Sequence, residues 1–157
     1  MVNLLCMCLS VLAIFVTANG CSLKKQFVEK QIAVDETAIE GSYTWPDQQL
    51  KDKFKEYWGY RCEGDADRSF MLEAPYTREM ISPERYNNFI RAAKDKNWSG
   101  IKIKKIEWVT AQLIKVDFYL QYCDSEKIMH DVFFQDSWII MGNRWCHAFK
   151  DPFLLPD

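Results

Sequence analysis

Hydrophobic residues follow two different spacings along the chain, and the change falls near Gly100. Between residues 44 and 100 the apolar positions recur every three or four residues, whereas after Gly100 they alternate with polar positions. The first spacing predicts helices and the second predicts strands. Helices followed by a run of strands predict an α+β fold, with N-terminal helices packed on one face of a meandering antiparallel sheet.

Three helices are predicted before Gly100. The first begins at Thr44, which can cap it, with Pro46 at an early helical position. Its apolar stripe consists of Leu50, Phe54, Tyr57, Trp58 and Cys62. A short second helix is predicted over residues 67–73, and the third begins at Ser82 and Pro83 and ends at residues 97–100.

The strands after Gly100 are separated by recognisable turns. A first strand spans residues 101–108, with one slip in its alternation that indicates a bulge, and a second spans residues 112–123. The third covers residues 128–141, with a bulge expected near 135–137. Gly142 and Asn143 form a two-residue hairpin signal, after which residues 144–150 pair back.

The first twenty residues contain no Lys, Arg, Asp or Glu. Their apolar run, Leu4 to Val16, is shorter than the roughly 20 residues that a membrane-spanning helix needs, and its length is typical of a secretory signal peptide. The segment Ala18-Asn19-Gly20-Cys21 resembles the lipobox of bacterial lipoproteins. That resemblance implies a diacylated Cys21 as the mature N-terminus, and Ser22 then implies export to the outer membrane, facing the periplasm. The alternative is an ordinary signal peptide with Cys21 as a plain thiol.

The chain is therefore divided into three parts. With the lipobox resemblance, residues 1–20 are expected to form a lipoprotein signal peptide, residues 21–43 the lipidated cysteine and a lead-in, and residues 44–157 a single domain. Three cysteines remain in the mature domain, so at most one intramolecular disulfide forms. Cys123 and Cys146, placed on neighbouring strands, are the expected pair in an oxidising compartment.

Composition narrows the classes of partner. Twenty Lys and Arg against 22 Asp and Glu give a net charge of −2, so no nucleic-acid-binding surface is expected. The two histidines, His130 and His147, belong to no HxH or HExxH pattern, and no cysteine pair has CxxC spacing. Neither a metal nor a cofactor is expected.

Several segments together resemble the nuclear transport factor 2-like superfamily. They are Phe54–Trp58, Gly64–Asp65, Phe70–Pro75, Ser82–Tyr86 and the hairpin from Trp138 through Gly142 to Trp145. The resemblance covers about residues 44–150 and implies a cone, in which a curved antiparallel sheet wraps around a long helix. That superfamily includes isomerases, dehydratases, hydrolases, scaffolds and binding modules, so the resemblance implies no single activity. Cystatin-like inhibitors share the helix-wrapped sheet.

If the protein is an enzyme, a general acid or base is expected to face into the cone. The candidates are polar residues on the predicted strands: Asp117, Tyr119, His130, Asp131 and Asp136. His130 shares a face with Val132 and Phe134 and is therefore a candidate inward histidine. No two candidates have the spacing of a known dyad, so no catalytic residue is assigned.

The 23 aromatic residues are the remaining unusual feature. Most are expected in the core, while others are expected to line a pocket for a small apolar ligand or to form a partner interface, including a homodimer through the sheet. The sequence thus predicts a non-enzymatic, lipid-anchored protein of the bacterial envelope that binds a partner or ligand. A small pocket enzyme of the isomerase or dehydratase type is the first alternative, and a secreted inhibitor-like domain without lipid is the second.

Overall fold

The computed structural model describes residues 32–36, 44–91 and 97–149. Cys21, the predicted leader and residue 150 of the last predicted strand lie outside these ranges. Inside the described ranges, five strands form one sheet in the order β1-β2-β3-β4-β5. Their bounds are β1 Ala33–Asp35, β2 Asn97–Thr110, β3 Leu113–Cys123, β4 Met129–Met141 and β5 Arg144–His147.

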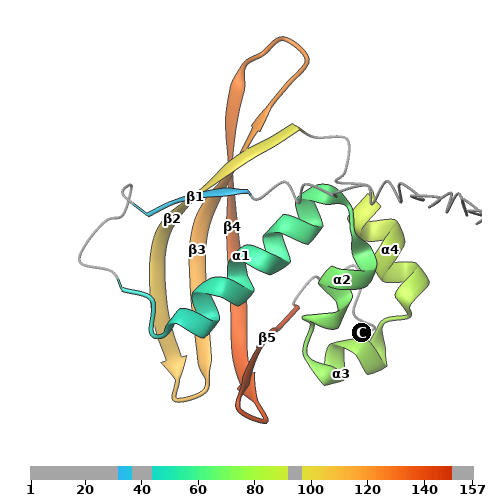
Figure 1. Ribbon diagram of the computed structural model, residues 1–157, viewed down its shortest axis with the longest axis vertical. Coiled ribbons are helices and arrows are strands. Elements are labelled where there is room, and N and C mark those ends of the chain that lie inside the picture. The colour runs from blue at the N-terminus through green and yellow to red at the C-terminus, as the bar shows by residue number, and fades with distance from the viewer. Residues whose placement is uncertain (1–31, 37–43, 92–96, 150–157) are drawn as a thin grey trace, which may run out of the picture.

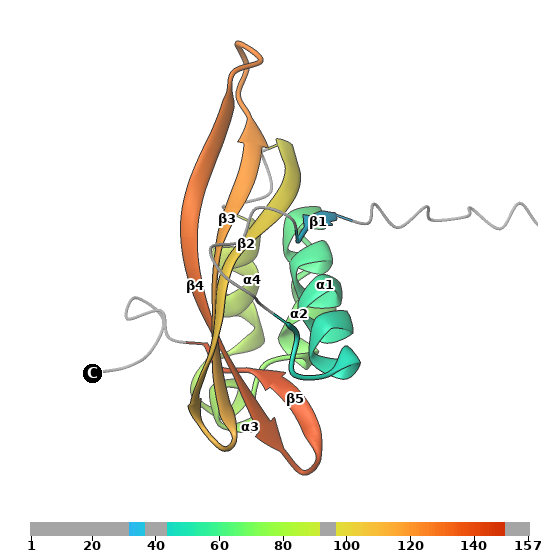
Figure 2. The same cartoon turned by 90° about the vertical axis from the view of Figure 1, so that its left-hand side faces the viewer.

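Within the described residues, four helices accompany the sheet: α1 Gln48–Glu63, α2 Ala66–Met71, α3 Pro75–Met80 and α4 Pro83–Arg91. Figure 1 shows α1 running diagonally across the sheet, with α2, α3 and α4 gathered beside it, and the view in Figure 2 places α1 on one side of the curved sheet. A long helix lying against the concave face of a curved sheet is the arrangement that the resemblance implied. The predicted α+β fold class is therefore confirmed.

Helix α1 begins three residues later than predicted from a cap at Thr44. Asp47 is the cap, because its Oδ1 accepts a hydrogen bond from the backbone N–H of Leu50 at 2.7 Å. Gly64 ends the helix with a positive φ of 73°, a conformation that glycine adopts at no steric cost. Pro75, two residues after the predicted end of the second helix, is the first residue of α3, a helix that the sequence pattern does not predict.

Strand β1 is a second departure, because it comes from the predicted lead-in and pairs in parallel with β2. The sheet is thus mixed, and not purely antiparallel as predicted. The bulge expected near residues 135–137 is wrong, since β3 and β4 pair in continuous register through that region. The slip within the first predicted strand is confirmed between Ile103 and Lys105. The hairpin at Gly142 and Asn143 is confirmed too, and both residues have the positive φ of its turn.

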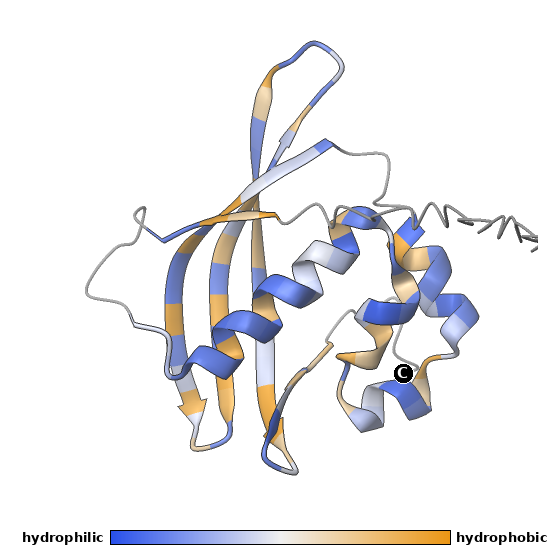
Figure 3. Ribbon diagram, in the orientation of Figure 1, coloured by the Kyte–Doolittle hydropathy of each residue, from blue (hydrophilic) through white to orange (hydrophobic). Residues whose placement is uncertain are grey.

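The core lies between α1 and the concave face of the sheet. Figure 3 shows the alternation of hydrophobic and hydrophilic residues along β2 and β3 that creates this face. Phe54 and Trp58 of α1 are at most 2 % exposed and contact Phe118 with ring centroids 5.2 and 5.0 Å apart. The other buried residues of this cluster are Leu50, Tyr57, Trp98, Ile101, Ile103, Ile114, Val116, Leu120, Trp138 and Trp145.

The predicted disulfide is wrong, because Cys123 and Cys146 are not joined and both keep free thiols. Cys123 ends β3 beside Met129, whereas Cys146 pairs with Ile139 near the other end of the sheet. The length of β3 between these two positions is about 33 Å, far beyond the roughly 6 Å between Cα atoms that a disulfide spans. Strand β4 also lies between the two strands that the prediction had taken as neighbours.

Candidate functional site

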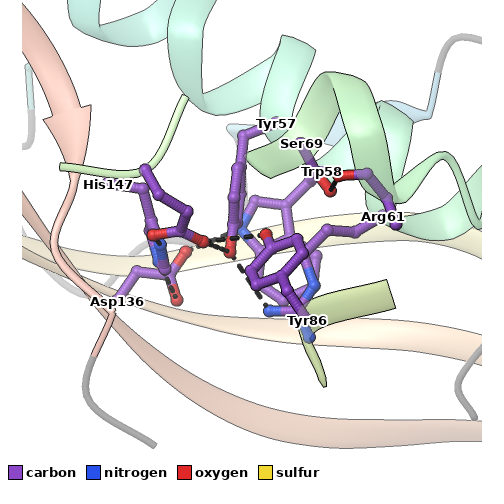
Figure 4. Close-up of polar contacts among 9 residues, drawn as sticks. Tyr57, Trp58, Arg61, Ser69, Tyr86, Asp136 and His147 are labelled. Carbon is purple, nitrogen blue, oxygen red and sulfur yellow. Dashed lines mark hydrogen bonds and ion pairs between the residues drawn. The ribbon is translucent and has the colours of Figure 1, made fainter. Parts of the chain in front are cut away.

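A cluster of ionisable side chains is buried inside the cone, where α1, the segment between α2 and α3, α4, β4 and β5 meet (Figure 4). Its central residue is Glu73, which is 1 % exposed. The hydroxyls of Tyr57 and Tyr86 both donate to Oε1 of Glu73 at 2.8 Å. Nδ1 of His147 lies 2.8 Å from the other oxygen, Oε2.

Asp136 is the second carboxylate of the cluster. Its Oδ2 accepts a hydrogen bond from Nε1 of Trp58 at 2.7 Å, and its Oδ1 lies 3.4 Å from Nε2 of His147. The imidazole therefore stands between two carboxylates, and it also stacks on the ring of Tyr57 with centroids 4.1 Å apart. Arg61 completes the cluster, because its guanidinium donates to the Tyr57 hydroxyl at 3.4 Å and lies 4.9 Å from the centre of the Trp58 ring.

The surroundings of His147 determine its charge. Burial by itself lowers the pKa of His147, but the negative charges of Glu73 and Asp136 raise it by more, to about 9. The imidazole is then charged near neutral pH and donates from both ring nitrogens. Burial raises the pKa of Tyr57 and of Tyr86, and the Glu73 carboxylate raises both further, so the two phenols stay neutral donors.

This cluster joins the helices to the sheet. The backbone N–H of Ala74 donates to the carbonyl of His147 at 2.8 Å, and the N–H of His147 donates to the carbonyl of Leu72 at 2.8 Å. Glu73 and His147 are 1 % and 3 % exposed, and their side chains are hydrogen-bonded to one another. A general acid or base must reach a substrate, whereas these groups are enclosed by protein. What the arrangement does chemically is to hold a protonated imidazole between two carboxylates in the core.

The sequence candidates lie elsewhere, with one exception. Asp136, considered for its place on a strand, is part of the buried cluster. His130 does share the inner face with Val132 and Phe134, as predicted, but it lies beside the turn of the β3–β4 hairpin, away from the buried cluster. There its ring stacks on Tyr122 and its Nε2 lies 2.7 Å from Oδ2 of Asp124, a contact that lowers the pKa of the Asp124 carboxyl.

Asp117, Tyr119 and Asp131 all lie on the outer face of the sheet, opposite α1. Tyr119 pairs across strands with Phe133, and their rings are 5.7 Å apart in an edge-to-face arrangement. The ammonium of Lys104 lies 5.9 Å from the centre of the Phe133 ring. We refer to Lys104, Tyr119 and Phe133 as the outer aromatic patch.

Polar contacts border the outer aromatic patch on two sides. On one side Asp131 accepts a hydrogen bond from Gln121 at 2.9 Å and lies 3.6 Å from Lys102. On the other side Gln135 donates to Asp117 at 2.8 Å. Phe133 nevertheless remains 49 % exposed. An exposed aromatic residue within a polar border is typical of the anchor residues of protein interfaces.

The part of the chain that the structure describes contains no group of three or more His, Cys, Asp and Glu side chains suited to hold a metal ion. Within the same residues no helix combines the length and the apolar character that crossing a membrane requires.

Sequence reasoning missed most of the buried cluster. The sequence pattern identifies Glu73 only as the end of a predicted helix and Tyr57 only as part of an apolar stripe. One signal was available for Asp136: it lies between Phe134 and Trp138 on the apolar side of its strand, and a carboxylate in such a position needs a buried partner. No comparable signal connects Glu73 with His147, which are 74 residues apart.

No family model matches the chain, and no curated protein matches it. Solved structures do resemble it. A SEC-C motif containing protein from Psychrobacter arcticus aligns with a TM-score of 0.55 and 10% identity, covering 74% of this chain and 66% of that protein. This chain therefore spans slightly less than two thirds of that protein, and the similarity extends to the fold alone.

Two further structures align with lower scores. A SEC-C motif containing protein from Rhodopseudomonas palustris has a TM-score of 0.49 and 9% identity, with 73% of this chain and 96% of that one covered. An NTF-2-like protein of unknown function from Shewanella oneidensis has a TM-score of 0.46 and 13% identity, with 66% and 95% covered.

Proposed function

We propose that this protein is a lipid-anchored, non-enzymatic binding module of the bacterial envelope, which holds a partner protein on the outer face of its sheet. The observation that supports binding over catalysis is the distribution of side chains. Trp58, Glu73 and His147 fill the interior of the cone, whereas Phe133 stands half-exposed on the outside. Catalysis in the cone would instead require a carboxylate or imidazole that a substrate can reach.

The anchor in this proposal is the diacylated Cys21. It rests on the apolar run of residues 4–16 and on the small residue directly before the cysteine. Two acyl chains hold a protein on a membrane stably, whereas one holds it only marginally. Placement in the outer membrane facing the periplasm follows from Ser22 and is part of the same proposal.

The outer aromatic patch is the proposed contact surface. An edge-to-face pair such as Tyr119 and Phe133 presents a rigid apolar area, and covering it removes that area from water. The ion pair and hydrogen bonds around it supply polar groups that fix the orientation of a partner. The partner is a protein, either another envelope component or a second copy of this chain.

Photo-cross-linking in cells tests this surface. With benzoylphenylalanine in place of Phe133, we expect one discrete protein adduct. The adduct yield should fall about tenfold when Tyr119→Ser and Lys104→Glu are added, because these changes remove the second aromatic ring of the outer aromatic patch and reverse the charge beside it. The same group at the exposed position Glu84 of α4 is the control and should give no such adduct. The adduct's mass identifies a second copy or another protein. Equal labelling at positions 133 and 84, or an adduct unaffected by the two added changes, would contradict the proposal.

A further inference from the structure

The two ends of the sheet differ in charge. At one end the β2–β3 hairpin carries Trp108 and Val109, which are 51 % and 46 % exposed. The tip from Trp108 to Gln112 contains no charged residue. At the other end the β3–β4 hairpin also exposes aliphatic side chains, but its turn contains Asp124, Glu126 and Lys127. Figure 3 shows this second turn in hydrophilic colour and the ends of β2 and β3 in hydrophobic colour.

The uncharged tip contacts the rest of the domain through Trp108. The ring of Trp108 lies 5.9 Å from that of Trp145, which is buried. The Nε1 of Trp145 in turn donates to Oδ2 of Asp47, the cap of α1, at 2.9 Å. The β4–β5 hairpin reaches the same end of the molecule in Figure 1 and carries the exposed cation Arg144. This end therefore presents an apolar tip with a positive charge near it.

We infer that this end of the domain rests on the membrane, with the tip formed by Trp108 and Val109 inserted among the lipid headgroups. The inference rests on the proposed lipid anchor. An indole places its apolar ring and its polar N–H at the water–lipid boundary, which is why tryptophan is enriched there. Arg144 faces anionic headgroups favourably, whereas the acidic turn at the other end would be repelled by them.

The length of the tether permits this orientation. Ala33 pairs with Gly100, and Val109 lies nine residues farther along β2, a distance of about 30 Å. The chain from Cys21 to Ile32 has eleven Cα-to-Cα steps, which span up to about 36 Å when extended. The lipid on Cys21 can therefore lie in the membrane plane that the tip touches. In this orientation the strands rise from the membrane, and the outer aromatic patch stays open to a partner from the side.

The test uses the lipidated chain, purified from membranes and reconstituted in vesicles of phosphatidylethanolamine and phosphatidylglycerol. Benzoylphenylalanine replaces Val109 in one sample and Ile128 in the other. The two are matched, because both are exposed aliphatic residues at hairpin ends, 46 % and 51 % exposed. After illumination we expect phospholipid adducts at position 109 with about tenfold higher yield than at position 128, because only the first lies within the headgroup layer. Adding Trp108→Asp should reduce the yield at position 109.

Equal lipid adducts at the two positions, or no lipid adduct at position 109, would overturn the inference. A protein adduct alone at position 109 would overturn it as well and would identify the tip as a protein contact. The mass of the unilluminated chain separates this failure from a failure of the proposed anchor, since a lipid-free chain shows directly that the anchor itself is absent.

Discussion

Replacing Trp58 with alanine is expected to lower the free energy of unfolding by about 3–5 kcal/mol. The ring is 2 % exposed and lies against Phe118 and Phe134, with centroids 5.0 and 5.3 Å away. Its removal leaves a cavity in the cone and takes a hydrogen-bond donor from the buried Asp136. The measurement is urea-induced unfolding, followed by far-ultraviolet circular dichroism.

Two substitutions make this expectation specific. Trp58→Phe keeps most of the apolar contact but removes the N–H, so it should cost only about 1–3 kcal/mol. Trp108→Ala removes a tryptophan that is 51 % exposed and should cost about 1 kcal/mol or less. A loss below about 1 kcal/mol for Trp58→Ala would contradict the packing of α1 inside the sheet.

Stability is also expected to fall as the pH rises from 6.5 to about 9, by up to about 3 kcal/mol. The pKa of His147 is about 9 in the folded protein, because the two carboxylates outweigh the effect of burial, against an ordinary value of 6.5. Because the pKa of His147 is higher in the folded protein, its contribution to stability is complete below pH 6.5, where His147 is protonated in both the folded and the unfolded protein. That contribution is lost as the pH rises through the pKa of His147 in the folded protein. Urea unfolding at a series of pH values measures it.

Variants of the buried cluster identify the source of this pH dependence. Glu73→Gln removes one of the two negative charges beside the imidazole, so the decline should become smaller and the protein less stable at pH 6.5. His130→Asn is the matched control, because His130 is the other histidine of the chain and lies outside the cluster. A decline that His130→Asn abolishes and Glu73→Gln leaves unchanged would contradict the assigned role of His147.

Local patterns were sufficient to predict α1, α2, α4 and strands β2 to β5 in their correct order. Alternation along residues 112–123 predicts the strand and the side that its apolar residues face, and Gly142 with Asn143 predicts the hairpin. The start of α1 was misplaced because several capping residues precede it, and only the hydrogen bond of Asp47 distinguishes them. Strand β1 was missed because three residues with a parallel partner carry little pattern of their own.

The functional residues were harder to predict because they depend on contacts between distant segments. Alternation correctly placed Asp117 and Tyr119 on the face opposite Val116 and Phe118, but one strand does not show which face is concave. The contact between Phe118 and Phe54 of α1 shows that the face with Phe118 is the concave one, and this contact exists only in the tertiary structure. The same limit applies to Cys123 and Cys146, whose separation depends on the order of strands in the sheet.

The proposal depends above all on the anchor, and the intact mass of the protein extracted from cell membranes tests it most directly. Under non-reducing conditions the account predicts a chain that begins at Cys21 and carries the added mass of diacylglycerol, with no internal disulfide. A lipid-free chain, whether cleaved or uncleaved, would contradict the account. It would remove both the envelope anchor and the proposed contact of the β2–β3 tip with the membrane.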